Sequence, residues 1–308
     1  MRLFELTVAL AISSGVAILL VGLGELLAEK VGVLNIGLEG IMLMGAVAGF
    51  IGGAHTHNPV LGLLFAAGVG GVFNLVFGLA TVALKADQII CGLALVFMGI
   101  GFSGEWGKTY VQHAASGTIS TWRVPGFSDI PVLGPILFRQ VWLVYVALFL
   151  PFLGLFLLNH TRHGLNMRAI GDDPAAADAA GIPVVRWQMF YVFVCGALGG
   201  VGGGYLSQGV IQHWSDGLTG GLGWIALAIV FVAGWRPVGL IFAACLFGGL
   251  HALNDVAQQY GWPIPSEFLS MLPYLGTFAV VIARGVWYRR RGAGGVAPEA
   301  LGIPFIRS

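Results

Sequence analysis

The segment Pro59–Ala67, with the sequence PVLGLLFAA, returns in the second half of the chain as Pro237–Ala244, with the sequence PVGLIFAA. Each copy is followed by two adjacent glycines and then by an asparagine, which is Asn74 in the first copy and Asn254 in the second. This similarity predicts two related units in one chain. The alternative is that apolar, glycine-rich helices resemble one another, since short apolar similarity is weak evidence of a repeat.

The composition places both units in a membrane. Of the 308 residues, 57% are hydrophobic and 9% are charged, whereas about a quarter of the residues in soluble globular domains are charged. The mean hydropathy is +0.88. Several apolar runs reach the roughly 20 residues that a membrane-spanning helix needs, and no segment alternates as an outer-membrane barrel strand does. The predicted fold class is therefore an all-α polytopic membrane protein.

About nine transmembrane helices are predicted from the apolar runs. We expect them at residues 5–24, 37–53, 60–83, 88–105, 140–158, 188–207, 221–235, 238–255 and 267–284. Spans one to four, at about 5–105, would form the first repeat, and spans six to nine, at about 188–284, the second. Because five spans separate each element from its copy, the two repeats would have opposite orientations. Such inverted repeats recur in transporters, with the substrate path at their interface.

Charge predicts the orientation and the limits of the domain. If the polar 159–187 loop and the C-terminus are cytoplasmic, eleven of the 15 Lys and Arg residues lie inside, in agreement with the positive-inside bias. The N-terminus is then predicted outside. We expect one transmembrane domain at 1–288, with 159–187 as a coupling loop, and a cytoplasmic basic tail at 289–308.

The 159–187 loop contains the residue pattern of a short helix outside the membrane. Asp173 suits the N-cap, Pro174 the first helical position, Ala175–Ala177 the body and Gly181 the C-terminal stop. A helix this short is marginal alone in water, so it needs a surface to pack against. It lacks the large apolar and basic faces of a membrane-surface helix, and a protein partner is therefore favoured over lipid headgroups.

These residues carry a resemblance to a known family. The segments Thr161–Gly164, Arg168–Ala177 and Ala180–Ile182 resemble the coupling loop of bacterial ATP-binding cassette (ABC) importer permeases of the ribose, branched-chain amino acid and nucleoside group. Gly32–Ala46 and Gly220–Ala228 resemble the nucleoside branch, which includes the basic membrane protein-associated permeases. The resemblance covers most of the chain.

The resemblance implies a permease subunit of an importer in the bacterial inner membrane. Its coupling helix would dock into a cleft on a cytoplasmic ABC ATPase, which binds ATP and Mg. The residues given this coupling role are Asp172, Asp173, Pro174, Ala175, Ala176, Ala177 and Gly181. Further implied partners are a second permease subunit, identical or homologous, and an extracytoplasmic solute-binding protein or lipoprotein. The expected substrate is a small polar solute, in particular a nucleoside.

The chain itself is not expected to be an enzyme. Gly107, Lys108 and Thr109 resemble the end of a phosphate-binding loop, but Phe102 stands where that loop needs its first glycine. ATP hydrolysis must then come from a separate subunit, with no cofactor bound by this chain. We expect no catalytic residue and no metal site. The net charge of +1 gives no indication of a nucleic acid partner.

Five polar residues are predicted to line the translocation path or its gate. They are Asn35, Glu39, Asn74, Gln88 and Asn254. Polar groups within lipid tend to face a bundle interior or a cavity, but each could instead bond a neighbouring helix. Asn35 and Glu39 belong to Gly32–Gly40, between the first two spans. This stretch is either a helix break beside the path or a plain cytoplasmic turn, and its counterpart in the second repeat is 217–221.

Two other functions fit parts of the sequence. A secondary, ion-coupled transporter would also use inverted repeats, but we expect no deep membrane pair of acidic or basic residues for ion coupling. An intramembrane hydrolase would use Ser103, in a Gly-Phe-Ser-Gly motif that resembles that of rhomboid proteases, together with His251. Four residues are weak support for such a site.

Overall fold

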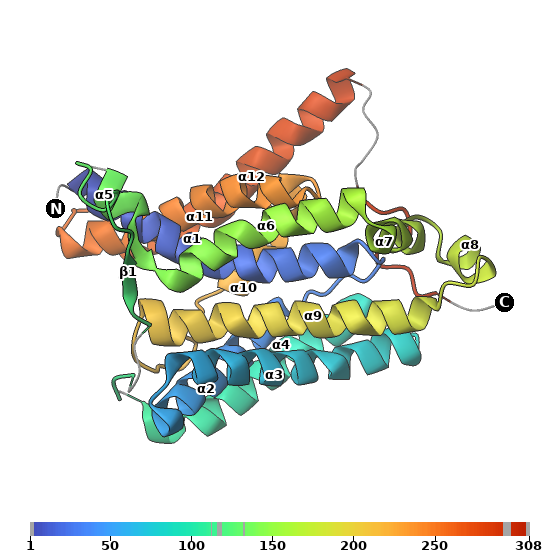
Figure 1. The fold of residues 1–308 in the computed structure, drawn as a ribbon, viewed down its shortest axis with the longest axis horizontal. Helices are drawn as coiled ribbons and strands as arrows, with labels where there is room; N and C mark the ends of the chain where they lie inside the picture. Colours follow the sequence, from blue (N-terminus) through green and yellow to red (C-terminus); the bar gives the residue numbers. More distant parts are fainter. Residues whose placement is uncertain (1–2, 112, 116–118, 132, 292–296, 306–308) are drawn as a thin grey trace.

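Long helices run side by side along one axis of the molecule (Figure 1). The computed structural model describes residues 3–111, 113–115, 119–131, 133–291 and 297–305. Within these residues, eight helices are long and apolar enough to cross a membrane. The chain is therefore a multi-pass membrane protein, and its all-α fold class is confirmed.

The first group of helices covers residues 3–110. It comprises α1 (Leu3–Glu29), α2 (Leu38–Thr56), α3 (Pro59–Gly78), which continues as a π-helical turn (Leu79–Ala83), and α4 (Gln88–Gly107), which ends in a 3-10 turn (Lys108–Tyr110). A polar connection follows, with α5 (Leu133–Leu137) and the antiparallel strands β1 (Thr121–Arg123) and β2 (Arg139–Val141). These two short strands were not predicted.

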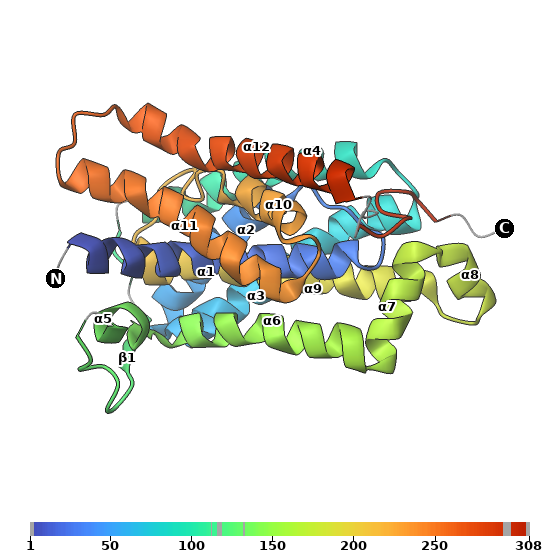
Figure 2. The same cartoon turned by 90° about the horizontal axis from the view of Figure 1, so that it is seen from above.

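The remaining helices follow roughly the same axis, apart from the short α7 and α8 and the inclined α12 (Figure 1). They are α6 (Trp142–His160), α7 (Arg162–Asp172), α8 (Pro174–Ala179), α9 (Val184–Tyr205) with a π-helical turn (Leu206–Val210), α10 (Leu222–Ala233), α11 (Pro237–Gln259) and α12 (Ser266–Arg291). The short helices α7 and α8 lie at the end of the molecule opposite the N-terminus (Figure 2). Residues 297–305 lie at that same end.

A helix occupies each of the nine predicted positions, but nine full-length spans are not confirmed. The seventh, α10, has only 12 residues, or about 18 Å at 1.5 Å per residue, against a hydrocarbon core of about 30 Å. Gly221 and Gly234 stop it at its two ends, with φ angles of 88° and 67° that favour glycine. The inverted repeat stays a prediction.

Helix α1 is longer than predicted, because it continues from residue 24 to Glu29. Glu25 and Glu29 suggest a membrane boundary in the sequence, yet both side chains are fully buried. At the other end of the chain, α12 runs through the domain boundary placed at residue 288. Residues 292–296 and 306–308 of the predicted basic tail lie outside the described residues.

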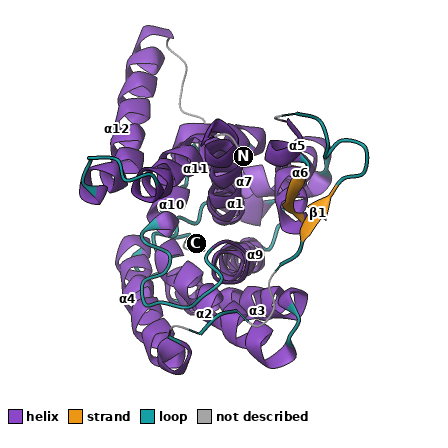
Figure 3. Ribbon diagram, turned by 90° about the vertical axis from the view of Figure 1, so that its left-hand side faces the viewer, coloured by secondary structure: helices purple, strands orange, loops and turns teal. Residues whose placement is uncertain are grey.

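The bundle is held together by close contacts between small residues. Helix α9 packs against α1, α2 and α3 and lies between them in the end-on view (Figure 3). A methyl group added to Gly45 of α2 would lie 2.3 Å from Cα of Gly200 of α9. The absence of side chains at Gly45 and Gly200 thus lets the two helices approach closely, as helix packing in lipid requires.

Candidate functional site

Two irregular connections were predicted as counterparts, and the helix that follows the first one meets the second one inside the bundle. The first joint is residues 30–37, between α1 and α2, and the second joint is residues 211–221, between α9 and α10. The start of α2 lies against the middle of α4, since a methyl on Gly99 would be 2.4 Å from Cα of Gly40. Gly99 is 11 residues into α4, about 16 Å along its axis. Helix α2 thus begins within the bundle and not at its end.

Glu39 connects the start of α2 to the start of α10. Its Oε1 accepts hydrogen bonds from Thr219 Oγ1 at 2.5 Å and from the Gly221 N–H at 2.9 Å. Its Oε2 accepts one from the Gly223 N–H at 2.8 Å. Gly221 and Gly223 are at the N-terminus of α10, and Glu39 itself is in the first turn of α2. The carboxylate therefore lies at the positive ends of two helix dipoles, which stabilises a negative charge there.

Asn35 ties the first joint to three helices. Its backbone N–H donates to Glu25 Oε1 of α1 at 2.7 Å, and its side-chain amide donates to Asn74 Oδ1 of α3, also at 2.7 Å. The Asn74 amide in turn donates to the Val192 carbonyl of α9 at 2.7 Å. Asn35 Oδ1 accepts from the Gly37 N–H at 2.7 Å. These bonds satisfy the irregular backbone that a lipid-exposed break would leave unpaired.

Three of the five predicted path residues form hydrogen bonds at the first joint, and Glu39 lies two residues beyond it. The third is Gln88, whose Oε1 accepts a hydrogen bond from the Leu34 N–H at 2.8 Å. Asn254 does not belong to this cluster. Its side chain bonds Ser270 of α12 at 3.2 Å and Gln258 of its own helix at 3.0 Å.

Glu25 and Glu29 are members of the cluster that the sequence analysis missed. Glu25 Oε2 accepts from Cys195 Sγ at 3.4 Å, and Glu29 Oε2 accepts from the indole N–H of Trp235. Both carboxylates are buried and lie four residues apart on one face near the end of α1, so they form a buried acidic pair. That spacing inside an apolar run was the available signal. The expectation of no deep membrane pair for ion coupling stays a prediction.

The structure does not support the predicted hydrolase pair. Ser103 Oγ donates to the Ile100 carbonyl of its own helix at 3.2 Å. Helix α4, which carries Ser103, packs against α2 and α3, whereas α11, which carries His251, packs against α1, α10 and α12. The nucleophile and the base of a hydrolase must lie within hydrogen-bond reach of each other, so these residues do not form such a site.

The coupling loop contains the predicted short helix and one more. The helix α8 is confirmed, with Asp173 Oδ1 accepting from the N–H groups of Ala175 at 3.0 Å and Ala176 at 2.9 Å. Ala177 is buried and Gly181 adopts a φ of 84° past the helix end. The preceding helix α7 was not predicted. Its N-cap is Thr161, whose hydroxyl accepts from the Gly164 N–H at 3.0 Å.

The outer face of α8 is exposed at one end of the molecule (Figure 2). The exposed side chains or positions are Asp172, Asp173, Ala175, Ala176 and Gly181. Behind this face, α7 ends directly on the end of α1, since a methyl on Gly171 would be 2.5 Å from the Lys30 carbonyl. Burial lowers the pKa of the Lys30 ammonium, and the nearby Asp172 and Glu29 carboxylates partly offset that effect. The coupling loop is thus in contact with the first joint.

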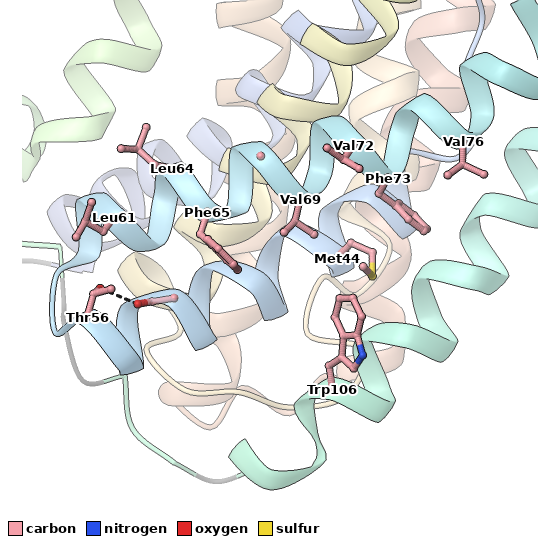
Figure 4. Close-up of a pocket in the computed structure, with 12 residues that line it drawn as sticks. Met44, Thr56, Leu61, Leu64, Phe65, Val69, Val72, Phe73, Val76 and Trp106 are labelled. Carbon is pink, nitrogen blue, oxygen red and sulfur yellow. Dashed lines mark hydrogen bonds between the residues drawn. The ribbon is translucent and has the colours of Figure 1, made fainter.

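An apolar cavity of about 710 Å³ lies apart from this cluster, between α2, α3 and α4 (Figure 4). Phe65, Val69, Phe73 and Trp106 point into it from α3 and α4. Its lining has no charged side chain, and the Thr56 hydroxyl donates to the Gly52 carbonyl at 2.7 Å. Such a lining suits lipid or another apolar helix better than a polar solute.

Comparison with known proteins places the whole chain in one context. The sequence model of a family described as the permease component of the branched-chain amino acid transport system matches residues 7–281. NupC, a nucleoside ABC transporter permease protein of Lactococcus lactis, is 34% identical over 93% of this chain and 92% of its own. NupQ, a guanosine ABC transporter permease protein of Bacillus subtilis, is 33% identical over 94% and 93%. TsgC13 of Haloferax volcanii, provisionally named a glucose ABC transporter permease protein, is 34% identical over 88% of both chains.

Proposed function

We propose that this chain, which belongs to the family of branched-chain amino acid transport system permease components, carries nucleosides across the membrane. It is a transport subunit of the ABC class and not the enzyme that hydrolyses ATP. The nucleoside assignment is supported by the names of NupC and NupQ, which match nearly the full length of the chain. The similarity to TsgC13 makes a sugar the competing substrate.

The proposal rests on the presence of two features in one chain. They are the exposed helix α8 and the buried contact of Glu39 with the start of α10. The exposed face of α8, with Asp172, Asp173, Ala175 and Ala176, would dock onto a cytoplasmic ATPase. Pro174, Ala177 and Gly181 would hold the helix in place for that contact. ATP and Mg would bind the partner and not this chain. The end of the molecule that carries α8 would then be cytoplasmic, with the N-terminus outside the inner membrane.

The buried contact between Glu39 of α2 and the start of α10 would serve as the gate. Irregular backbone within a membrane persists where it is buried in protein or lines a water-filled path. In transporters, two helices that begin at mid-membrane often place their positive ends at the substrate site. Asn35, Asn74 and Gln88 would supply hydrogen bonds to a polar solute or to the closed gate. Alternating access then requires the bonds between Glu39 and α10 to break and re-form.

The complete importer would contain further subunits. A second permease, identical or homologous, would complete the path, and an extracytoplasmic binding protein or lipoprotein would deliver the solute. The chain would then need no high-affinity site of its own. Ion-coupled transport by this chain alone is the alternative, and the buried Glu25 and Glu29 pair gives it a specific basis.

Uptake into proteoliposomes tests the proposal. The native complex, purified through a tag on this chain, is reconstituted and supplied with radiolabelled guanosine, uridine or glucose, with and without ATP. We expect ATP-dependent uptake of the nucleosides in excess of glucose. Preferential glucose uptake would contradict the substrate, and ATP-independent uptake by this chain alone, driven by a proton gradient, would contradict the ABC mechanism.

A further inference from the structure

Residues 297–305, which we call the C-terminal strap, cross the end of the bundle between the coupling loop and the first joint. The Ala300 N–H donates to the Gly171 carbonyl at the end of α7 at 2.9 Å. The Gly302 N–H donates to the Gly32 carbonyl of the first joint at 3.2 Å. Two backbone hydrogen bonds from neighbouring residues therefore connect two segments that are far apart in the sequence.

Both contacted positions are glycines, and the strap lies close to each of them. A methyl on Gly171 would be 3.1 Å from Cβ of Pro298, a buried strap residue. Gly32 has a φ of 83°, which favours glycine, and its added methyl would be 3.4 Å from the Ala300 carbonyl. The strap is therefore packed against backbone on both sides.

Phe305 anchors the far end of the strap. Its side chain is 7% exposed and lines a cavity together with Val82, Ala83, Lys85, Asp178 and Val184 among others. Lys85 Nζ is 5.7 Å from the centre of the ring, within the range of a cation–π contact. This cavity brings together the end of α3, the helix α8 and the start of α9.

We propose that the strap transmits the movement of the coupling helix to the first joint, and hence to the gate at Glu39. This inference rests on the proposed function. Because the strap bonds Gly171 and Gly32 through residues only two positions apart, a displacement of the coupling loop displaces the joint as well, unless those bonds break. Phe305 adds a second connection, since its ring lies beside Lys85 of the α3–α4 turn and lines the same cavity as Asp178 of α8. The strap acts through its position and contacts no substrate.

The test compares two apolar residues of the strap. Phe305→Ala removes the buried anchor, whereas Ile303→Ala removes a side chain that is 61% exposed. The native complex that carries each variant is reconstituted, and guanosine uptake is measured per ATP hydrolysed. We expect Phe305→Ala to lower this ratio by roughly fivefold or more, the scale of typical coupling free energies between sites. Ile303→Ala should leave it within twofold, a change worth about 0.4 kcal/mol.

The ratio separates transmission from mere folding, because it is independent of the amount of assembled complex. If Phe305→Ala prevents assembly, Phe305→Leu keeps an apolar side chain but removes the ring beside Lys85, and it should still lower the ratio. An unchanged ratio in whichever of these variants assembles overturns the proposal, as does an equal fall in Ile303→Ala. Failure of the proposed function is seen separately, as absent ATP-dependent uptake by the wild-type complex.

Discussion

Glu39→Gln tests the claim that this carboxylate holds the starts of helices α2 and α10 together. The carboxylate accepts three hydrogen bonds, two at Oε1 and one at Oε2. A glutamine has the same shape but only one acceptor oxygen. If the amide oxygen takes the Oε1 position, its NH₂ group faces the Gly223 N–H and one bond is lost. If it takes the Oε2 position, two bonds are lost.

The expected cost follows from this geometry. One hydrogen bond to a charged group contributes about 1.5–3 kcal/mol, and a negative charge at a helix N-terminus contributes about 0.3–1 kcal/mol. Glu39 is 7% exposed, so water cannot replace the lost partner. Loss of one bond and of the charge should therefore cost at least about 2 kcal/mol. At about 2 °C per kcal/mol for a chain of this length, Tm should fall by about 4 °C or more.

The assay is thermal unfolding of the detergent-solubilised chain, and size-exclusion chromatography measures the fraction that stays folded at each temperature. Glu105→Gln is the matched control, because Glu105 pairs with Lys108 on a surface where the carboxylate side chain is 66% exposed. Exposed ion pairs contribute roughly 0–1 kcal/mol, so its Tm should change little. Thr219→Val in the Glu39→Gln background should cost less than in the wild type. Equal Tm values for the wild type and Glu39→Gln would refute the assignment.

Three further predictions concern other parts of the molecule. Asp173→Lys or Ala176→Pro should remove the N-cap or break α8, and abolish guanosine uptake while the inserted protein persists in membranes at normal amounts. Gly45→Ala should lower Tm because the added methyl would lie 2.3 Å from Cα of Gly200 on α9. The methyl of Gly68→Ala would meet no atom within 4 Å, so this variant should gain about 1 kcal/mol of helix propensity and raise Tm slightly. Burial lowers the pKa of Lys30, so the unfolded chain binds more protons there, and stability should rise as the pH approaches 10.5 in the wild type but less so in Lys30→Met.

Local patterns predicted those parts of the structure that local interactions determine. The cap, proline and glycine of α8 act within a few residues of one another, so Asp173 and Gly181 identified that helix from sequence alone. Apolar runs likewise predicted positions at which the described residues form long or apolar helices. Their ends were less predictable, because Glu25 and Glu29 suggest water in a sequence while the fold supplies Cys195 and Trp235 as partners.

The candidate site shows the same division between local and tertiary information. Asn74 and Asn254 hold matching places in the two sequence segments, and each was predicted to face the path. Asn74 meets the first joint, whereas Asn254 meets Ser270 of α12. A residue type and a spacing cannot distinguish these outcomes, because the difference lies in which distant segment packs opposite. The strap is a further case, since residues 297–305 carry no pattern that indicates where they bind.

The order of contacts suggests how the two proposals can be tested against each other. The strap connects the coupling loop to Gly32, the first joint continues from Gly32 to Glu39, and Glu39 bonds the start of α10. If movement travels along this route, Phe305→Ala and Glu39→Gln interrupt the same process. Their combined effect on guanosine uptake per ATP should then be smaller than the product of their separate effects, because coupled sites depart from additivity. If the effects multiply, the strap and the Glu39–α10 contact act independently. The contacts along the route between them are then structural only.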